Sequence, residues 1–151
     1  MSETDRIEKR IVLKATQSRV WRALSDAKEF GAWFGCAIEG AFEAGRTMKM
    51  RITKPAGYEH IPFAIVIDRI EPETLFSYRW HPYAIDPNHD YSKEPMTLVE
   101  MRLTEKGGAT ELVIVESGFD KIPAERRAEA LKMNTGGWGA QAENLRKYVE
   151  A

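Results

Sequence analysis

The sequence has few of the features that identify a function directly. Cysteine occurs once, at Cys36, which excludes an intramolecular disulfide and fits a reducing compartment. Lys and Arg total 22 and Asp and Glu total 23, so no excess of positive charge points to nucleic acid or to an anionic membrane surface. No apolar run approaches the roughly 20 residues that span a bilayer, and the polar start MSETDRIEKR lacks the apolar core of a signal peptide. These absences predict a cytoplasmic protein with neither a nucleic-acid nor a membrane partner.

Catalytic and metal-binding motifs are also missing. The sequence has no Gly-rich phosphate loop, no nucleophile elbow, no CxxC and no HExxH spacing. The histidines His60, His81 and His89 all lie in or beside two long loops. His81 and His89 could combine with Asp86 and Asp90 in a metal site, but the spacing of these residues matches no known ligand pattern. We expect no metal and no cofactor.

A long amphipathic segment near the end of the chain is the clearest positive feature. It predicts a helix over residues 122–149, with Pro123 in its first turn and an apolar face that packs on a sheet. The residues assigned to that face are Leu131, Trp138 and Leu145, spaced by seven, with Ala128, Ala142 and Val149.

Three glycines interrupt this predicted helix around its tryptophan. Gly136, Gly137 and Gly139 flank Trp138, and each costs about 1 kcal/mol of helix propensity relative to alanine. One explanation is close packing, because a glycine lets a helix backbone approach a sheet. The other is that the missing side chains leave a hollow with Trp138 as one wall. The sequence leaves both open.

Most of the remaining chain alternates apolar and polar residues with a period of two. Met48, Met50 and Ile52, for example, alternate with Lys49 and Arg51. The pattern predicts strands near 6–14, 37–42, 46–53, 61–71, 74–81, 96–105 and 109–117, and short helices at 18–25 and 27–34. We therefore predict a single α+β domain over residues 1–151, in which a curved seven-stranded antiparallel sheet wraps around the final helix.

Two further segments have more than one interpretation. Phe30, Trp33 and Phe34 cluster at the end of a short predicted helix, where aromatic residues more often fill a core than touch a ligand. The loop 81–95 has three prolines and many polar residues, and loops of this length are usually functional or mobile. We predict that it forms a mobile lid or covers a sheet edge, and that trimming it alters binding more than stability.

Several segments together resemble the START-like superfamily, also called SRPBCC, and within it the branch related to the activator of the 90 kDa heat-shock protein ATPase. The resemblance implies a helix-grip fold, with a cavity between the curved sheet and the final helix. Superfamily members include lipid carriers, polyketide cyclases, small hydrolases and a co-chaperone domain, so the fold leaves the function open. The segments are Val20-Trp21-Arg22-Ala23-Leu24, Trp33-Phe34, Glu71-Pro72 before Leu75-Phe76-Ser77-Tyr78-Arg79-Trp80, Val115-Glu116-Ser117-Gly118-Phe119-Asp120, and Gly137-Trp138 with Leu145.

Glu116 is the acidic residue with the most interesting position. The period that places Leu112 and Ile114 inward also turns Glu116 inward, where an unpaired carboxylate has a raised pKa and serves as a ligand contact or general base. The alternative is a structural acid, hydrogen-bonded to backbone or to an arginine. The predicted ligand-binding residues are Trp33, Phe34, Tyr78, Trp80, Val99, Met101, Ile114, Glu116 and Trp138.

Three functions from different classes fit these features. We favour non-catalytic binding of a small hydrophobic or amphipathic molecule, because an apolar cavity with a few polar groups suits such a ligand. A cyclase-type or hydrolase-type enzyme using Glu116 or Tyr78 is the second, although the strands supply no acid–base partner. A co-chaperone or stress-related interaction module with a chaperone partner is the third, although we expect no additional chaperone-binding domain. We expect a monomer or a homodimer.

Overall fold

The structure, a computed structural model, describes residues 5–54, 61, 63–86 and 88–151. Within these residues, seven strands form one antiparallel sheet in the order β1-β7-β6-β5-β4-β3-β2. The strands are β1 (Arg6–Leu13), β2 (Cys36–Ile38), β3 (Thr47–Ile52), β4 (Phe63–Glu71), β5 (Leu75–Trp80), β6 (Thr97–Lys106) and β7 (Ala109–Ser117). The predicted α+β class and seven-stranded antiparallel sheet are confirmed.

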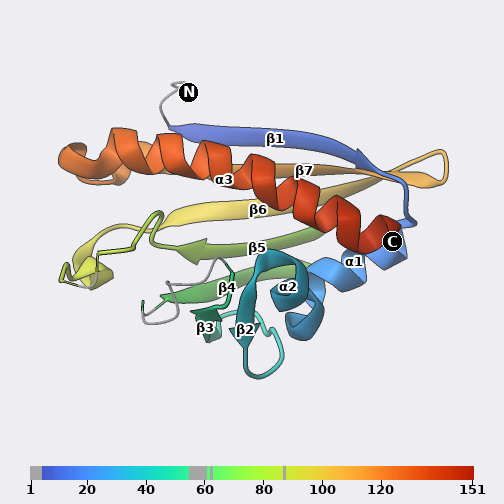
Figure 1. Cartoon of the computed structure of the whole chain (residues 1–151), viewed down its shortest axis with the longest axis horizontal. Helices are drawn as coiled ribbons and strands as arrows, with labels where there is room; N and C mark the ends of the chain where they lie inside the picture. Colours follow the sequence, from blue (N-terminus) through green and yellow to red (C-terminus); the bar gives the residue numbers. More distant parts are fainter. Residues whose placement is uncertain (1–4, 55–60, 62, 87) are drawn as a thin grey trace.

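Two short helices follow the first strand, and each begins and ends as its sequence indicates. Thr16 caps α1 (Gln17–Ser25) by accepting a hydrogen bond from the backbone N–H of Arg19. Asp26 caps α2 (Ala27–Phe34) in the same way, and Gly35 ends that helix in the left-handed conformation, with φ of 93°. Figure 1 shows both helices at the end of the sheet where the final helix finishes. They therefore close that end of the molecule.

The final helix, α3 (Ala124–Glu150), lies along one face of the sheet (Figure 1). Its buried residues are Ala130, Trp138, Ala142, Leu145 and Val149. Leu131 is half-buried and packs against the core, but Ala128 is exposed, so its predicted place on the apolar face was wrong. Ala128 lies three heptads before Val149, and a straight helix drifts about 20° per heptad relative to a repeat of seven, so Ala128 turns away from the buried side of α3.

Two predicted boundaries also differ from the structure. β2 ends at Ile38 rather than near residue 42, because Gly40 takes a left-handed φ of 94° that an extended strand does not contain. Pro123 precedes α3 instead of lying in its first turn, and a 3₁₀ turn, η2 (Phe119–Lys121), joins β7 to the helix. No helix in the described part of the chain is long and apolar enough to cross a membrane.

Candidate functional site

Aromatic rings from three elements meet beside the middle of α3. Phe34 comes from the last turn of α2, Trp80 from the end of β5, and Trp138 from α3. The centroid of the Trp80 ring lies 5.7 Å from that of Trp138, and the Phe34 ring lies 6.0 Å and 6.3 Å from the two indoles. Contacts at such distances hold the three rings as one apolar wall.

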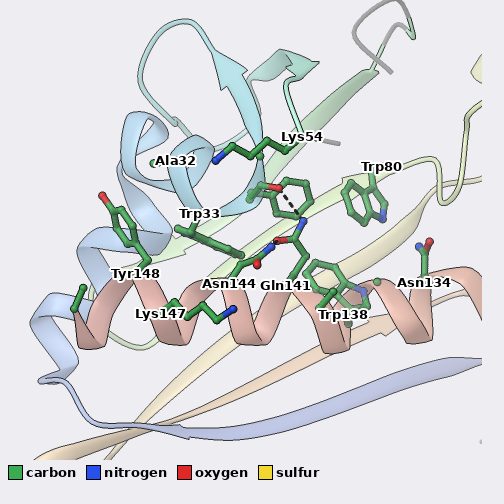
Figure 2. Close-up of a pocket in the computed structure, with 15 residues that line it drawn as sticks. Ala32, Trp33, Lys54, Trp80, Asn134, Trp138, Gln141, Asn144, Lys147 and Tyr148 are labelled. Atoms are coloured by element: carbon green, nitrogen blue, oxygen red, sulfur yellow. Dashed lines mark hydrogen bonds between the residues drawn. The ribbon is translucent and has the colours of Figure 1, made fainter. Parts of the chain in front are cut away.

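This wall forms the inner side of a pocket of about 870 Å³ that opens to solvent between α2 and α3 (Figure 2). Trp80 is the one strand residue among its lining residues in the described part of the chain. The pocket is lined by Ala32, Trp33, Phe34, Gly35, Lys54, Trp80, Asn134, Gly137, Trp138, Ala140, Gln141, Asn144, Lys147, Tyr148 and Ala151. The pocket therefore lies mainly between two helices rather than between the sheet and α3, where the sequence placed it.

Amide side chains on α3 provide most of the polar groups of the pocket. Gln141 donates a hydrogen bond to the backbone carbonyl of Phe34 across the pocket, at 2.8 Å, and so ties α3 to the end of α2. Asn144 in turn donates to the Gln141 carbonyl, at 3.1 Å. The hydroxyl of Tyr148 donates to Glu29, at 3.1 Å. These bonds fix the polar rim in place while leaving amide atoms facing the pocket.

Glu116 lies directly behind the aromatic wall and is fully buried. One carboxylate oxygen accepts from the indole N–H of Trp138 (2.8 Å) and from the amide of Asn134 (2.9 Å). The other accepts from the indole N–H of Trp80 (2.7 Å) and from the hydroxyl of Thr97 (2.5 Å). Four donors around one carboxyl group match its ionised, acceptor-only form. Three of these donors belong to residues that line the pocket, so Glu116 sets the orientation of the lining from behind.

The structure agrees with the predicted inward position of Glu116 and with the alternative that it is a structural acid. It faces the interior, as the strand period indicated, and it belongs to a structural network. Its partners are side-chain donors rather than the backbone or an arginine. Sequence reasoning missed them because they come from β5, β6 and α3, and no local spacing relates those segments.

The other buried groups with acid–base chemistry are held protonated away from the pocket. Burial, and secondarily the negative charge of Glu116, raise the pKa of the Tyr78 phenol well above its ordinary value of 10.0. The Tyr78 hydroxyl has no hydrogen-bond partner among the described residues. Burial raises the pKa of the Cys36 thiol to about 12, and its sulfur lies 3.8 Å from that of Met50. Cys36 therefore acts as a small buried apolar residue.

The nine predicted ligand-binding residues divide into two groups. Trp33, Phe34, Trp80 and Trp138 line the pocket. Tyr78, Val99, Met101, Ile114 and Glu116 are buried in the packed interior and do not appear on the lining. Lys54, Asn134, Gln141, Asn144, Lys147 and Tyr148 line the pocket but were missed. The amphipathic pattern of the final helix was the one sequence signal that could have identified the missed residues on α3. It places polar residues near Trp138 at the edge of the apolar face of the helix.

The glycines of α3 do not serve close packing. A Cβ atom added at Gly136, Gly137 or Gly139 meets no atom within 4 Å, so the close-packing explanation was wrong. Gly137 is exposed and lines the pocket, where the missing side chain widens the opening. Close approach occurs instead at Gly31, where an added Cβ would overlap the backbone carbonyl oxygen of Cys36.

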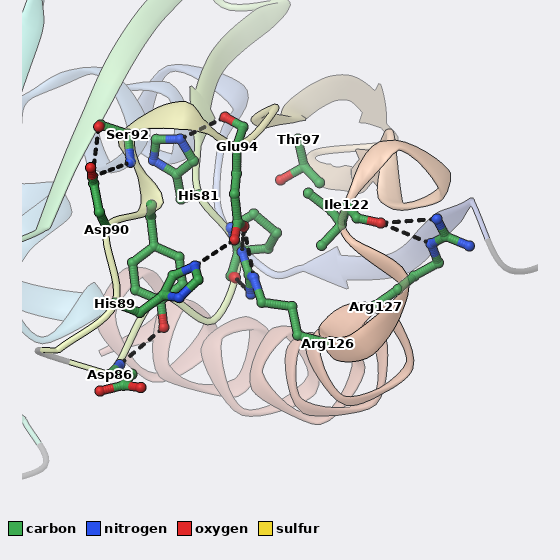
Figure 3. A network of polar contacts seen from close by, with 12 residues as sticks. His81, Asp86, His89, Asp90, Ser92, Glu94, Thr97, Ile122, Arg126 and Arg127 are labelled. Carbon is green, nitrogen blue, oxygen red and sulfur yellow. Dashed lines mark hydrogen bonds and ion pairs between the residues drawn. The ribbon is translucent and has the colours of Figure 1, made fainter.

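The loop 81–95 is attached to the other end of α3 (Figure 3). Arg126 pairs with the Glu94 carboxylate at 2.7 Å and donates to the backbone carbonyl of Pro82 at 2.7 Å. His89 also contacts Glu94, at 2.6 Å. None of the described residues of this loop lines the pocket, so the predicted lid does not form over it.

The polar residues of the same loop are engaged in local hydrogen bonds. The His81 ring contacts the Glu94 backbone carbonyl, Asp86 accepts from the Asn88 backbone, and Asp90 accepts from Ser92. Among the described residues, no group of three or more His, Cys, Asp or Glu side chains is placed to hold a metal ion.

Comparison with known proteins identifies a family model and a set of similar folds. Residues 14–150 match the family described as activator of Hsp90 ATPase homolog 1-like protein. No curated protein matches the chain.

Three similar solved structures share less than a quarter of their sequence with this chain, and they show the fold alone. DynU16, described as a putative protein in the dynemicin biosynthetic locus, has 21% identity and a TM-score of 0.73 over 97% of this chain and 48% of that one, so this chain spans about half its length. The Aha1 dimer of Colwellia psychrerythraea has 18% identity and a TM-score of 0.72 over 96% of each chain. CalU16 of Micromonospora echinospora has 22% identity and a TM-score of 0.66 over 95% of this chain and 75% of that one.

Proposed function

The chain belongs to the family of activator of Hsp90 ATPase homolog 1-like proteins, and from this premise we propose that it binds a small hydrophobic or amphipathic molecule in the pocket between α2 and α3, without transforming it. The family match and the observed fold agree with the resemblance to the START-like superfamily found in the sequence. The superfamily includes binding proteins and enzymes, so the choice between them depends on the site.

The pocket carries the proposal. Its volume of about 870 Å³ falls within the range of roughly 300 to 1,000 Å³ that is typical of small-molecule sites. An aromatic wall of Phe34, Trp80 and Trp138 offers apolar surface to a ligand, and amides such as Gln141 offer a few fixed polar contacts. An apolar pocket with a small number of positioned polar groups is the usual form of a binding site for such molecules.

The enzyme alternative has less support. It would use Glu116 or Tyr78, and both side chains are fully buried and absent from the pocket lining. The Glu116 carboxylate already accepts four hydrogen bonds from protein side chains. Neither group touches a molecule in the pocket unless the interior rearranges, so binding without chemistry is the simpler function.

A matched pair of alanine substitutions tests the proposal. Ala140 and Ala128 are both exposed on α3, but only Ala140 lines the pocket. The uncharged fluorophore N-phenylnaphthylamine should bind the unmodified protein with saturable, micromolar affinity. Ala140→Phe fills part of the pocket and should weaken this binding at least about tenfold, a change of about 1.4 kcal/mol, whereas Ala128→Phe should leave it unchanged.

The result that contradicts the proposal is equally clear. If the probe does not bind, or if Ala140→Phe binds it as tightly as the unmodified protein does, the pocket is not a binding site. Native mass spectrometry of freshly purified protein adds an independent check, because it detects a co-purifying small molecule and also shows whether the particle is a monomer or a homodimer.

A second candidate, a co-chaperone role, is favoured by the family match and by the likeness to an Aha1 dimer. In this role the chain would contact a chaperone of the 90 kDa heat-shock class. Adding the purified chain should then change the ATP hydrolysis rate of such a chaperone. An unchanged rate at saturating concentrations of the chain would remove this candidate and leave the pocket proposal intact.

A further inference from the structure

Both charged side chains on the pocket lining are basic. Lys54 and Lys147 both line the pocket, and none of the lining side chains in the described part of the chain is acidic. The whole sequence has nearly equal numbers of acidic and basic residues, 23 and 22, so the lining differs from the rest of the chain. Figure 2 shows Lys54 arriving from the segment after β3 and Lys147 from the last turns of α3, with Trp33 between them in this view.

Within the residues that the structure describes, no ion pair involves Lys54 or Lys147. At this end of the lining, the Tyr148 hydroxyl donates a hydrogen bond to Glu29. Two other cations already hold Glu29, because Arg19 lies 2.7 Å and Arg22 lies 2.8 Å from its carboxylate oxygens.

The opposite charge lies behind the aromatic wall. The Glu116 carboxylate is buried there with four neutral donors and no cationic partner among the described residues. Its negative charge disfavours an anion close to Trp80 and Trp138, while the two lysines favour one at the opening. The field across the pocket therefore favours a ligand whose negative end faces outward.

From this arrangement we propose that the ligand is an amphipathic anion. Its apolar body would lie against Phe34, Trp80 and Trp138, and its single anionic head group would lie at the opening between Lys54 and Lys147. The inference rests on the proposed function, because it concerns the same pocket. It adds a charge requirement that an apolar pocket alone does not impose.

Two fluorophores with the same ring system provide the test. Anilinonaphthalene sulfonate carries one negative charge, and N-phenylnaphthylamine has the same rings without the sulfonate. The sulfonate should bind at least about tenfold more tightly than the neutral probe, with a preference that falls as salt is added, because salt screens partly exposed charges.

A double variant and a matched control locate the effect. Lys54→Gln with Lys147→Gln should reduce the preference for the sulfonate to about twofold or less while changing the neutral probe little. Lys28→Gln with Lys132→Gln removes the same charge from exposed positions on α2 and α3 that do not line the pocket, and it should keep the preference.

The outcomes separate the two proposals. Equal binding of both probes to the unmodified protein, or equal loss of preference in both double variants, overturns the anion inference and leaves the pocket as a binding site. If neither probe binds in a saturable manner, both proposals are overturned. A preference that disappears only when Lys54 and Lys147 are replaced supports the inference.

Discussion

Replacing Glu116 with glutamine should show how far one buried carboxylate holds the pocket lining together. Glutamine keeps the shape of the side chain but presents one carbonyl oxygen and one NH₂ group to four donors. The Thr97 hydroxyl accepts a hydrogen bond after a simple rotation, whereas the Asn134 amide would have to flip to do so, and we therefore expect the NH₂ group to lie next to Thr97. There it faces the indole N–H of Trp80, which lies 2.7 Å from the carboxylate oxygen in the present structure. Glu116→Gln therefore leaves one buried indole donor without an acceptor.

The expected loss of stability follows from these contacts. A buried donor without a partner costs about 1–3 kcal/mol. The bonds from Asn134 and Trp138 remain, but they lose the strengthening that an ionised acceptor provides, roughly 1 kcal/mol in total. Burying a neutral group instead of a charged one works in the opposite direction. We therefore expect a net loss of about 2 kcal/mol, which for a chain of this length lowers the melting temperature by roughly 4–8 °C.

Urea unfolding followed by tryptophan fluorescence measures the change. The control is Glu111→Gln on the same strand, β7, where the carboxylate pairs with Arg10 at 3.3 Å near the surface. Surface ion pairs contribute about 0–1 kcal/mol, so the control should unfold almost like the unmodified protein. If Glu116→Gln is also within about 0.5 kcal/mol of the unmodified protein, the network does not need a carboxylate, and the reasoning about the pocket lining is wrong.

Three further predictions concern other parts of the molecule. Gly137→Ala should raise the unfolding free energy by up to about 1 kcal/mol, because its new Cβ meets no atom within 4 Å. Gly31→Ala should lower the unfolding free energy, because its new Cβ would overlap a backbone carbonyl oxygen. Urea unfolding of both variants measures these changes, and a loss of stability in Gly137→Ala would contradict the prediction. Deleting residues 86–90 should leave the affinity for N-phenylnaphthylamine unchanged, and a clear loss in a fluorescence titration would show that the loop reaches the pocket. Partial burial raises the pKa of Glu94, but the hydrogen bonds and charges of Arg126 and His89 together outweigh it, and the pKa lies below its ordinary value of 4.5. These contacts of Glu94 therefore stabilise the fold above about pH 4.5 and lose their effect as the pH falls through the lowered value, so the acid-induced loss in urea midpoint should be smaller in Glu94→Gln.

The sequence by itself determined the secondary structure, because each element leaves a local signal. Alternation of apolar and polar residues placed all seven strands, and it also turned Glu116 inward, since side chains of a strand alternate between its two faces. The starts of the two short helices also depend on neighbouring residues, because the side chains of Thr16 and Asp26 accept hydrogen bonds from the first backbone N–H groups of α1 and α2. Four of the predicted binding residues, all aromatic, line the pocket: Trp33, Phe34, Trp80 and Trp138.

The position and the chemistry of the pocket were decided only by the tertiary structure. Whether the helix glycines pack closely or leave open space depends on how α3 crosses the sheet, and residue spacing within α3 does not contain that angle. The partners of Glu116 come from three elements and lie up to 36 residues from it in the chain, and Lys54 and Lys147 line the same pocket although they are far apart in the sequence. A periodic pattern describes which side of one element is apolar, whereas a site depends on contacts between elements, and those distances arise only when the chain has packed.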